Sequence, residues 1–320
     1  MKAKLFMIAT AATLLAACGN DENEINNGPV EARITAGIDG PKTRAIDQDW
    51  KEGNTIGVMV TNALSSGMKG LYKNVKYNVN NIGRTGSFDP AVTGQGIFFQ
   101  DASETVTFAA YSPYQSSTTA ATLPGTAGTV TGANTKDQTM QEKREAVDYL
   151  FASGAMASKN TPAVEFKESH QFEHKMARLI LVLQTSTTDG FTADQVGKGT
   201  YKLGGLKHDG TFNVTDGTAT ATGNAVSDWD ITSNYYIDGS PADTRTYTMI
   251  LYPQTSGALA FSATIEGQTY TNNSDIHPAS LAAGTSYTYT ITMKKTGLTV
   301  SGCTIAAWNP GTTGSGNATM

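Results

Sequence analysis

Alternation of apolar and polar residues dominates this chain and predicts a protein made of β-strands. The first strand places five small or apolar residues on one face: Val30, Ala32, Ile34, Ala36 and Ile38. The same pattern predicts further strands at residues 55–61, 71–79, 104–111, 163–172, 174–184, 200–206, 211–214, 244–252, 258–265, 267–271, 286–294 and 298–307. Many short strands separated by Gly, Pro and Asn favour an all-β fold made of β-sandwiches.

Four segments depart from this alternation. Residues 116–135 lack periodicity and are predicted to form a long loop, whereas residues 140–147 are predicted to form a short surface helix. Leu179 to Leu183 is continuously apolar, which is typical of a strand buried on both faces. The polar segment Thr185 to Gly190 then breaks the pattern, so we place a domain boundary there, between residues 45–186 and residues 187–320.

The first residues resemble a bacterial lipoprotein signal peptide. Lys2 and Lys4 precede an apolar run that ends in Leu15-Ala16-Ala17-Cys18, the pattern of a lipobox. The run is too short to span a bilayer as a stable helix, so residues 1–17 are predicted to be removed. Cys18 would then carry the lipid, because the modification needs a thiol at the new N-terminus. The alternative is an ordinary signal peptide followed by a chance cysteine.

Residues 18–44 are predicted to form a lipidated tether followed by the first strand. The acidic segment Gly19 to Glu24 resembles a surface-export signal of Bacteroidetes lipoproteins, although a solvated tether has the same composition. These features predict an outer-membrane lipoprotein precursor at the cell surface.

Composition narrows the range of functions. A net charge of −5 argues against nucleic acid as a partner. The chain has two cysteines, so lipidation of Cys18 leaves Cys303 with no partner for a disulfide within the chain. Stability must therefore come from burial and from hydrogen bonds within sheets.

No group of residues supports catalysis, a cofactor or a metal. His170 and His174 are four residues apart, but the surrounding pattern is that of a strand, which would separate them by about 13 Å along one face. Hydrogen-bonded histidines are the simpler interpretation. No Gly-x-Ser-x-Gly motif occurs, and Cys303 has no neighbouring cation in the sequence, so we interpret it as a buried and inert thiol.

Several motifs in order resemble the fimbrillins of Bacteroidetes, which are type V pilins of the Mfa-like and FimA-like kind. The matching segments are Thr43-Arg44 followed by Trp50, Gly53 and Ile56-Gly57-Val58, then Phe108 to Tyr114, Phe172 to Ala177, Leu251 to Gln254, Ala283 to Tyr289 and Ile305 to Trp308. Asn54 stands where the family usually has Asp. The resemblance implies two tandem transthyretin-like β-sandwich domains.

The resemblance also implies a surface pilus built by donor-strand exchange. Cleavage by an arginine-specific protease between Arg44 and Ala45 would release the lipid together with the first strand. A segment of another fimbrillin subunit, identical or different, would then fill the vacant groove. The chain would be held on the membrane through its lipid before cleavage and in the fimbria afterwards, as a shaft or tip subunit.

The predicted donor segment is residues 298–308. Its apolar residues are Leu298, Val300, Ile305, Ala307 and Trp308, and a change of phase near Gly302-Cys303 suggests a bulge. The alternative is that this segment is the last strand of its own domain.

A different function also fits the sequence. A surface-retained lipoprotein, either an adhesin or a pilus anchor, could bind a glycan or a host protein without being cleaved at Arg44. The N-terminus of the mature surface protein distinguishes these two functions.

Overall fold

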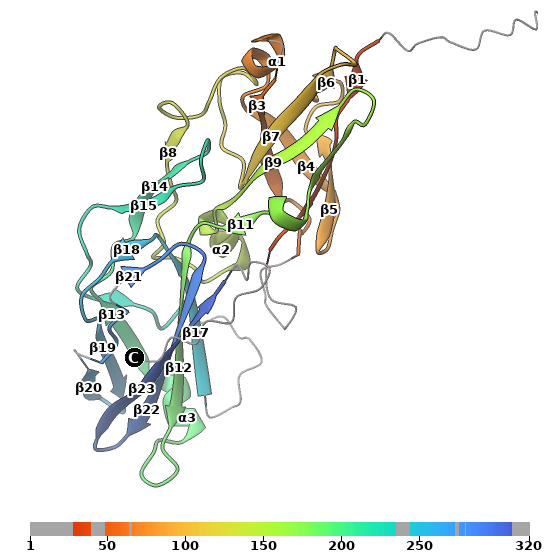
Figure 1. The fold of residues 1–320 in the computed structure, drawn as a ribbon. Helices are drawn as coiled ribbons and strands as arrows, with labels where there is room; N and C mark the ends of the chain where they lie inside the picture. The colour runs from red at the N-terminus through yellow and green to blue at the C-terminus, as the bar shows by residue number, and fades with distance from the viewer. Residues whose placement is uncertain are drawn as a thin grey trace, which may run out of the picture.

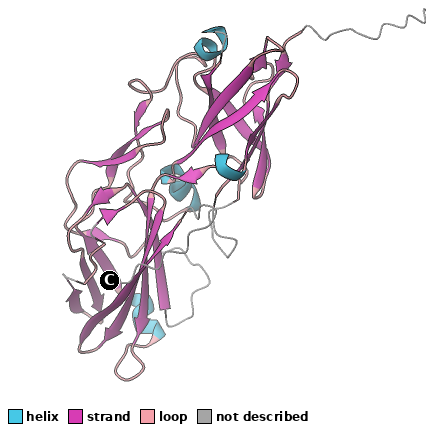
Figure 2. Cartoon of the chain, in the orientation of Figure 1, coloured by secondary structure: helices cyan, strands magenta, loops and turns pink. Residues whose placement is uncertain are grey.

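The computed structural model describes residues 28–39, 49–63, 66–234, 244–272, 275–278 and 280–308. Figure 1 shows an elongated arrangement, with the early strands at one end and the last strands at the other. Strands predominate among these residues, as Figure 2 shows, and the prediction of an all-β fold is confirmed. The helices are short: α1 (Ser66–Leu71), α2 (Gln141–Val147), α3 (Ala193–Lys198) and the 3-10 turn η1 (Glu168–His170).

One end of the molecule is an eight-stranded sheet. Its strands lie in the order β10 (Ala163–Phe166), β2 (Arg33–Gly37), β5 (Thr85–Pro90), β4 (Val75–Asn81), β3 (Thr55–Asn62), β7 (Thr105–Ser112), β9 (Leu150–Ser158) and β11 (Glu173–His174). Every neighbouring pair is antiparallel except β10 and β2, which are parallel. A separate short ribbon joins β1 (Val30–Glu31) to β6 (Phe98–Phe99). β9 lies close to β10 although they are distant in this order, so the sheet curls around its own apolar core.

The other end is a sandwich of two four-stranded sheets. The first contains β17 (Thr244–Leu251), β12 (Ala177–Thr185), β22 (Thr285–Lys294) and β23 (Gly297–Ala307) in that order. The second contains β16 (Trp229–Asp230), β13 (Thr200–Gly204), β19 (Ala260–Ile265) and β20 (Gln268–Asn272). Alternate residues of both sheets point into one shared core, which explains the period of two in the sequence.

A third core joins the two ends. It lies beside a small sheet of β15 (Ala219–Thr222), β14 (Asp209–Asn213) and β8 (Thr129–Thr131), and the short pair β18 (Gln254–Thr255) and β21 (Ser280–Leu281) lies nearby (Figure 1). Tyr149 of the early chain stacks on Phe212 with ring centroids 4.6 Å apart, and Trp308 is buried in the same cluster. The two ends are therefore packed together through apolar contacts.

The structure corrects several predicted elements. The segment at 116–135 contains β8, which pairs with β14, so it is not wholly a loop. The predicted strand 71–79 begins only at Val75, after α1, and η1 interrupts the one predicted at 163–172. The predicted surface helix is α2, yet its Arg144 and Val147 are buried. β5 and β9 were not predicted, because Gly, Ser and Ala obscure their alternation.

β12 corrects two further predictions. Its burial alternates along the strand, so the run Leu179 to Leu183 faces the core on one side only. β12 also pairs with β17 and β22 of the second sheet group, whereas the boundary after residue 186 would assign it to the first domain. The sheets therefore divide between β11 and β12. The division of the chain into two transthyretin-like domains remains a prediction.

Candidate functional site

The first strand of the described chain lies inside the eight-stranded sheet rather than at its edge. β2 pairs with β10 on one side and with β5 on the other. Two further backbone bonds hold the N-terminal end of this strand: Ala32 N–H donates to the Ile97 carbonyl at 2.8 Å, and Arg33 N–H donates to the Pro162 carbonyl at 2.9 Å. Loss of this strand would leave two facing strand edges unpaired, which exposes backbone groups that require partners.

Its side chains occupy the first core. Ala32, Ile34, Ala36 and Ile38 are each at most 4% exposed, whereas Val30 is only partly buried. They pack in one cluster with the aromatic residues Trp50, Phe88, Phe99, Phe166 and Phe172. The polar alternate position Arg33 is exposed. The strand therefore fills an apolar slot, with one face in the core and the other towards solvent.

Trp50, in the next described segment of the chain, covers the apolar slot that the first strand fills. Its indole N–H donates to the Ala36 carbonyl at 2.8 Å, and its ring meets Phe88 and Phe172 edge-on, with centroids 4.9 and 5.1 Å away. Gly86 on β5 lies so close that an added Cβ would approach the indole to 2.9 Å, so a residue without a side chain is required there. Trp50 thus holds the first strand by both packing and a hydrogen bond.

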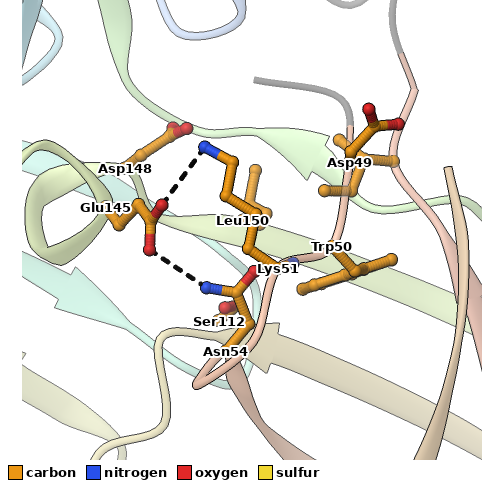
Figure 3. A pocket seen from close by; sticks show the side chains of 9 residues that line it. Asp49, Trp50, Lys51, Asn54, Ser112, Glu145, Asp148 and Leu150 are labelled. Atoms are coloured by element: carbon orange, nitrogen blue, oxygen red, sulfur yellow. Dashed lines mark hydrogen bonds and ion pairs between the residues drawn. The ribbon is translucent and has the colours of Figure 1, made fainter. Parts of the chain in front are cut away.

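A small pocket opens where the first strand ends. Figure 3 shows the side chains that line it, among them Trp50, Asn54, Glu145 and Asp148. The Glu145 carboxylate accepts from Lys51 Nζ and from the Asn54 side-chain amide, each at 3.2 Å. An Asp in place of Asn54 would set two carboxylates against each other, which gives a physical reason for the departure from the family pattern at this position.

The last strand has the opposite environment. Among the described strands, β23 lies at the end of its sheet and pairs with β22, and most of its residues are exposed. Tyr289 pairs with Cys303 and Thr290 pairs with Ser301, so Gly302 is an extra residue, and its φ is +41°. The bulge suggested by the sequence is therefore confirmed. It keeps Leu298, Val300 and Cys303 packed against the second core, although the extra residue lies between Val300 and Cys303.

Trp308, directly after β23, is buried to 1% exposure. Its ring stacks on His174 at 4.0 Å with planes 10° apart, and the Arg178 guanidinium lies 4.8 Å from the ring centroid. Its backbone N–H donates to the Gly284 carbonyl at 2.7 Å. Ile305, by contrast, is 40% exposed and Ala307 is also exposed. Trp308 is thus the one fully buried side chain of residues 297–308, all of which the structure describes.

Cys303 is partly buried on β23. Burial raises the pKa of its thiol, and hydrogen bonds with Tyr289 and with the Thr288 backbone lower it by less. The thiol is therefore protonated at neutral pH and reacts slowly, because the thiolate is the reactive form.

Cys18, Arg44 and Ala45 lie outside the described residues, so their predicted roles are untested by the structure. The two histidines are not on one strand: His170 is in η1, with its Nδ1 2.9 Å from the Ser153 carbonyl, and His174 is in β11, with its Nδ1 2.8 Å from Asp148. Within the described ranges, no group of three His, Cys, Asp or Glu residues is placed to bind a metal. None of the helices in these ranges is long and apolar enough to cross a bilayer.

Residues 43–308 match the model of the family described as Fimbrillin-like. The chain belongs to the fimbrillin-like family. It is 28% identical to a protein of Bacteroides uniformis named Putative fimbrium subunit Fim1C, over 99% of this chain and 100% of that one.

Solved structures share the fold of this fimbrillin-like chain. A putative cell adhesion protein from Bacteroides ovatus superposes with a TM-score of 0.70 at 24% identity, covering 88% of this chain and 98% of that chain. A putative cell adhesion protein from Bacteroides uniformis gives a TM-score of 0.66, also at 24% identity, with 88% and 99% coverage.

Sequence reasoning on this fimbrillin-like chain missed how its two terminal strands are held. The sequence predicts a hydrogen-bonded His174, but it predicts neither the stacking of His174 on Trp308 nor the contact of Arg178 with the same ring. Stacking of His174 on Trp308 joins residues far apart in sequence, which periodicity does not reveal. The sequence offers one indication that these residues matter: His174 and Trp308 each lie inside a motif of the family.

Proposed function

We propose that this protein is a structural subunit of a surface fimbria, forming its shaft or tip. It is exported as an outer-membrane lipoprotein precursor anchored through Cys18 and is activated by cleavage between Arg44 and Ala45. Activated subunits polymerise by donor-strand exchange. Family membership and the relative named as a fimbrium subunit support the fimbrial role. The partners are other fimbrillin subunits, an arginine-specific protease and, before cleavage, the membrane.

The observation that carries the proposal is the insertion of the first strand between β5 and β10. This strand is covalently continuous with the lipidated segment on one side and with the proposed cleavage point on the other. A cut after Arg44 therefore detaches the strand from the rest of the chain while the remaining strands of the sheet stay connected.

Energies explain why a vacant slot would be filled. Burial of Ile34 and Ile38 contributes roughly 1.5–3 kcal/mol each, before the alanines and the backbone bonds are counted. A whole domain is commonly stable by only about 5–15 kcal/mol. An empty slot lined by Trp50, Phe88 and Phe172 is therefore unfavourable, and an extended segment with alternating apolar residues relieves it by strand addition.

Residues 298–308 are the donor segment that we propose. With the bulge at Gly302 retained, the segment offers five small or apolar residues on one face, as the first strand does. In the precursor this segment is β23 of its own chain, so donation requires β23 to leave β22. The contact between subunits is head-to-tail and does not close, which is the geometry of a growing filament.

The Arg44→Ala substitution tests this proposal. We expect the variant to reach the cell surface and remain monomeric, while the wild-type protein forms multimers. Arg33→Ala is the matched control, since it removes an exposed arginine from the first strand but keeps Arg44. Normal multimer yield from Arg44→Ala would overturn the proposal and favour an uncleaved adhesin or pilus anchor that binds a glycan or a host protein.

A further inference from the structure

We propose that Trp308 is a latch that holds β23 on its own chain, and that departure of the first strand loosens this latch. The inference rests on the proposed function, because it concerns the order in which the two terminal strands are released. It assigns a positioning role to Phe172 and His174, which lie two residues apart and contact the two ends of the chain.

The latch follows from how unevenly β23 is held. Along the strand, Leu298, Val300 and Cys303 are only partly buried against the second core. Trp308 alone brings a large, fully enclosed side chain to this segment, and large aromatic side chains contribute most to such contacts. Once the Trp308 site opens, what remains is one ladder of backbone bonds to β22 and a shallow apolar contact.

The site that receives Trp308 belongs to the segment between the two sheets. His174 provides the stacking surface at 4.0 Å. The Gly284 carbonyl accepts from the Trp308 backbone, and Gly284 N–H in turn donates to the Met176 carbonyl at 2.8 Å. His174 therefore contacts the Trp308 ring directly, and Met176 supports Gly284, the backbone partner of Trp308.

The same short segment holds the end of the first strand. Phe172 N–H donates to the Gly37 carbonyl at 2.9 Å, and the Phe172 carbonyl accepts from Asp39 N–H at 2.8 Å. The Phe172 ring meets Trp50 and Phe166 in the first core. When the first strand leaves, Phe172 loses both backbone bonds and its neighbour Ile38. Phe172 is two residues before His174, on which the Trp308 ring stacks.

A second route runs through the pocket of Figure 3. Ile38, Asp148 and Leu150 line this pocket together, and the last two are labelled in the figure. Asp148 lies 2.8 Å from His174 Nδ1, and Leu150 is the backbone partner of His174 in the β9–β11 ladder. Removal of Ile38 opens the pocket to water, which weakens the Asp148–His174 interaction because screening increases. Both sets of contacts connect the first strand with His174, whose ring stacks on Trp308.

This arrangement orders the events of assembly. While the first strand is present, the slot is filled and β23 is latched, so the chain neither accepts nor donates a strand. Departure of the first strand empties the slot and loosens the latch together. A single cut therefore makes the subunit competent in both respects, which prevents premature polymerisation of the precursor.

Alkylation of Cys303 measures release of β23. The full chain is treated with a maleimide at low protein concentration, before and after an arginine-specific protease, and labelling is resolved by mass spectrometry of the peptide that contains Cys303. We expect Trp308→Ala to increase the labelling rate of the uncut chain at least about tenfold, the factor that 1.4 kcal/mol provides. We expect Trp308→Phe to increase it less, and cleavage to increase it in the wild-type chain.

The coupling is tested by Ile38→Ala against Ile56→Ala. Both remove buried apolar volume from the first core, but the backbone partner of Ile38 is Phe172, whereas that of Ile56 on β4 is Tyr77. We expect faster Cys303 labelling for Ile38→Ala than for Ile56→Ala at equal loss of global stability. Equal labelling of the two variants, or no change on cleavage, would overturn the coupling. If the proposed function itself fails, no chain begins at Ala45. Determination of the new N-terminus therefore distinguishes that failure from failure of the coupling.

Discussion

The two terminal strands of this protein are held in opposite ways. The first strand lies between two neighbours, with four alternate side chains buried in the core. The last strand has one neighbour in its sheet and is mostly exposed, with a single buried anchor just after it. Removal of the first strand vacates a deep apolar slot, whereas removal of the last strand exposes one strand edge and one tryptophan site.

In the assembly that we propose, this difference decides which strand is removed and which strand is donated. A removable strand must stay bound until the chain is cut, and burial of several side chains along the strand achieves that. A donor must leave its own sheet without unfolding the core, and an edge strand with one anchor meets that requirement.

A charged residue introduced in the middle of each terminal strand should give the largest difference in stability between the two strands. We expect Ile34→Asp to lower the free energy of unfolding by more than about 4 kcal/mol, because it places an unpaired carboxylate in the core. Ile305→Asp should cost less than about 1 kcal/mol, since Ile305 is 40% exposed. Urea denaturation of both variants measures the contrast, and similar midpoints would contradict it.

Truncation of single side chains compares the stability that Trp308 contributes with the stability that a residue along the last strand contributes. We expect Trp308→Ala to cost about 3–5 kcal/mol, as for other buried aromatic side chains. Leu298→Ala, at a partly buried position, should cost about 1 kcal/mol. Thermal unfolding compares the two variants. If Leu298→Ala proves as costly as Trp308→Ala, the strand is held along its length and the single-anchor interpretation is wrong.

Loss of one indole hydrogen bond tests how the first strand is held. Trp50→Phe removes the bond to the Ala36 carbonyl and should cost about 1–2 kcal/mol. Trp229→Phe removes a comparable bond, to the Lys136 carbonyl, at the other end of the molecule. Hydrogen–deuterium exchange of residues 33–37 should accelerate in Trp50→Phe and stay unchanged in Trp229→Phe. Equal acceleration would mean that the first strand responds only to global stability.

The smallest effect concerns the pocket where the first strand ends. Asn54→Asp places a carboxylate beside Glu145 and should cost less than about 1 kcal/mol at neutral pH, because the site is partly exposed. The cost comes from repulsion between two negative charges, so it is present at neutral pH and is lost on acidification to about pH 4, where carboxyl groups become neutral. Asn54→Ala is the control, and its effect on unfolding should not depend on pH in this range.

Periodicity predicted the strands that alternate cleanly. The first strand is an example, since Ala32, Ile34, Ala36 and Ile38 share one buried face. β9 escaped prediction because Ala, Ser and Gly carry little contrast between its faces. β12 was assigned to the first half because the polar turn after it looks like a boundary, whereas strand pairing is decided by contacts with β17 and β22, which are distant in sequence.

The candidate site was predictable to a similar extent. The residues of both terminal strands and the bulge at Gly302 could be found from the pattern of side chains. The support beneath Trp308 could not, because His174, Arg178 and Gly284 meet only when the two ends of the molecule pack together. Sequence patterns thus located the strands, and tertiary packing determines how firmly each is held.

The most direct test is N-terminal determination on chains taken from assembled fimbriae. We predict that these chains begin at Ala45 and that residues 28–39 are absent from them. Assembled chains that begin at Cys18 and retain residues 28–39 would contradict the central claim that the first strand is a removable plug.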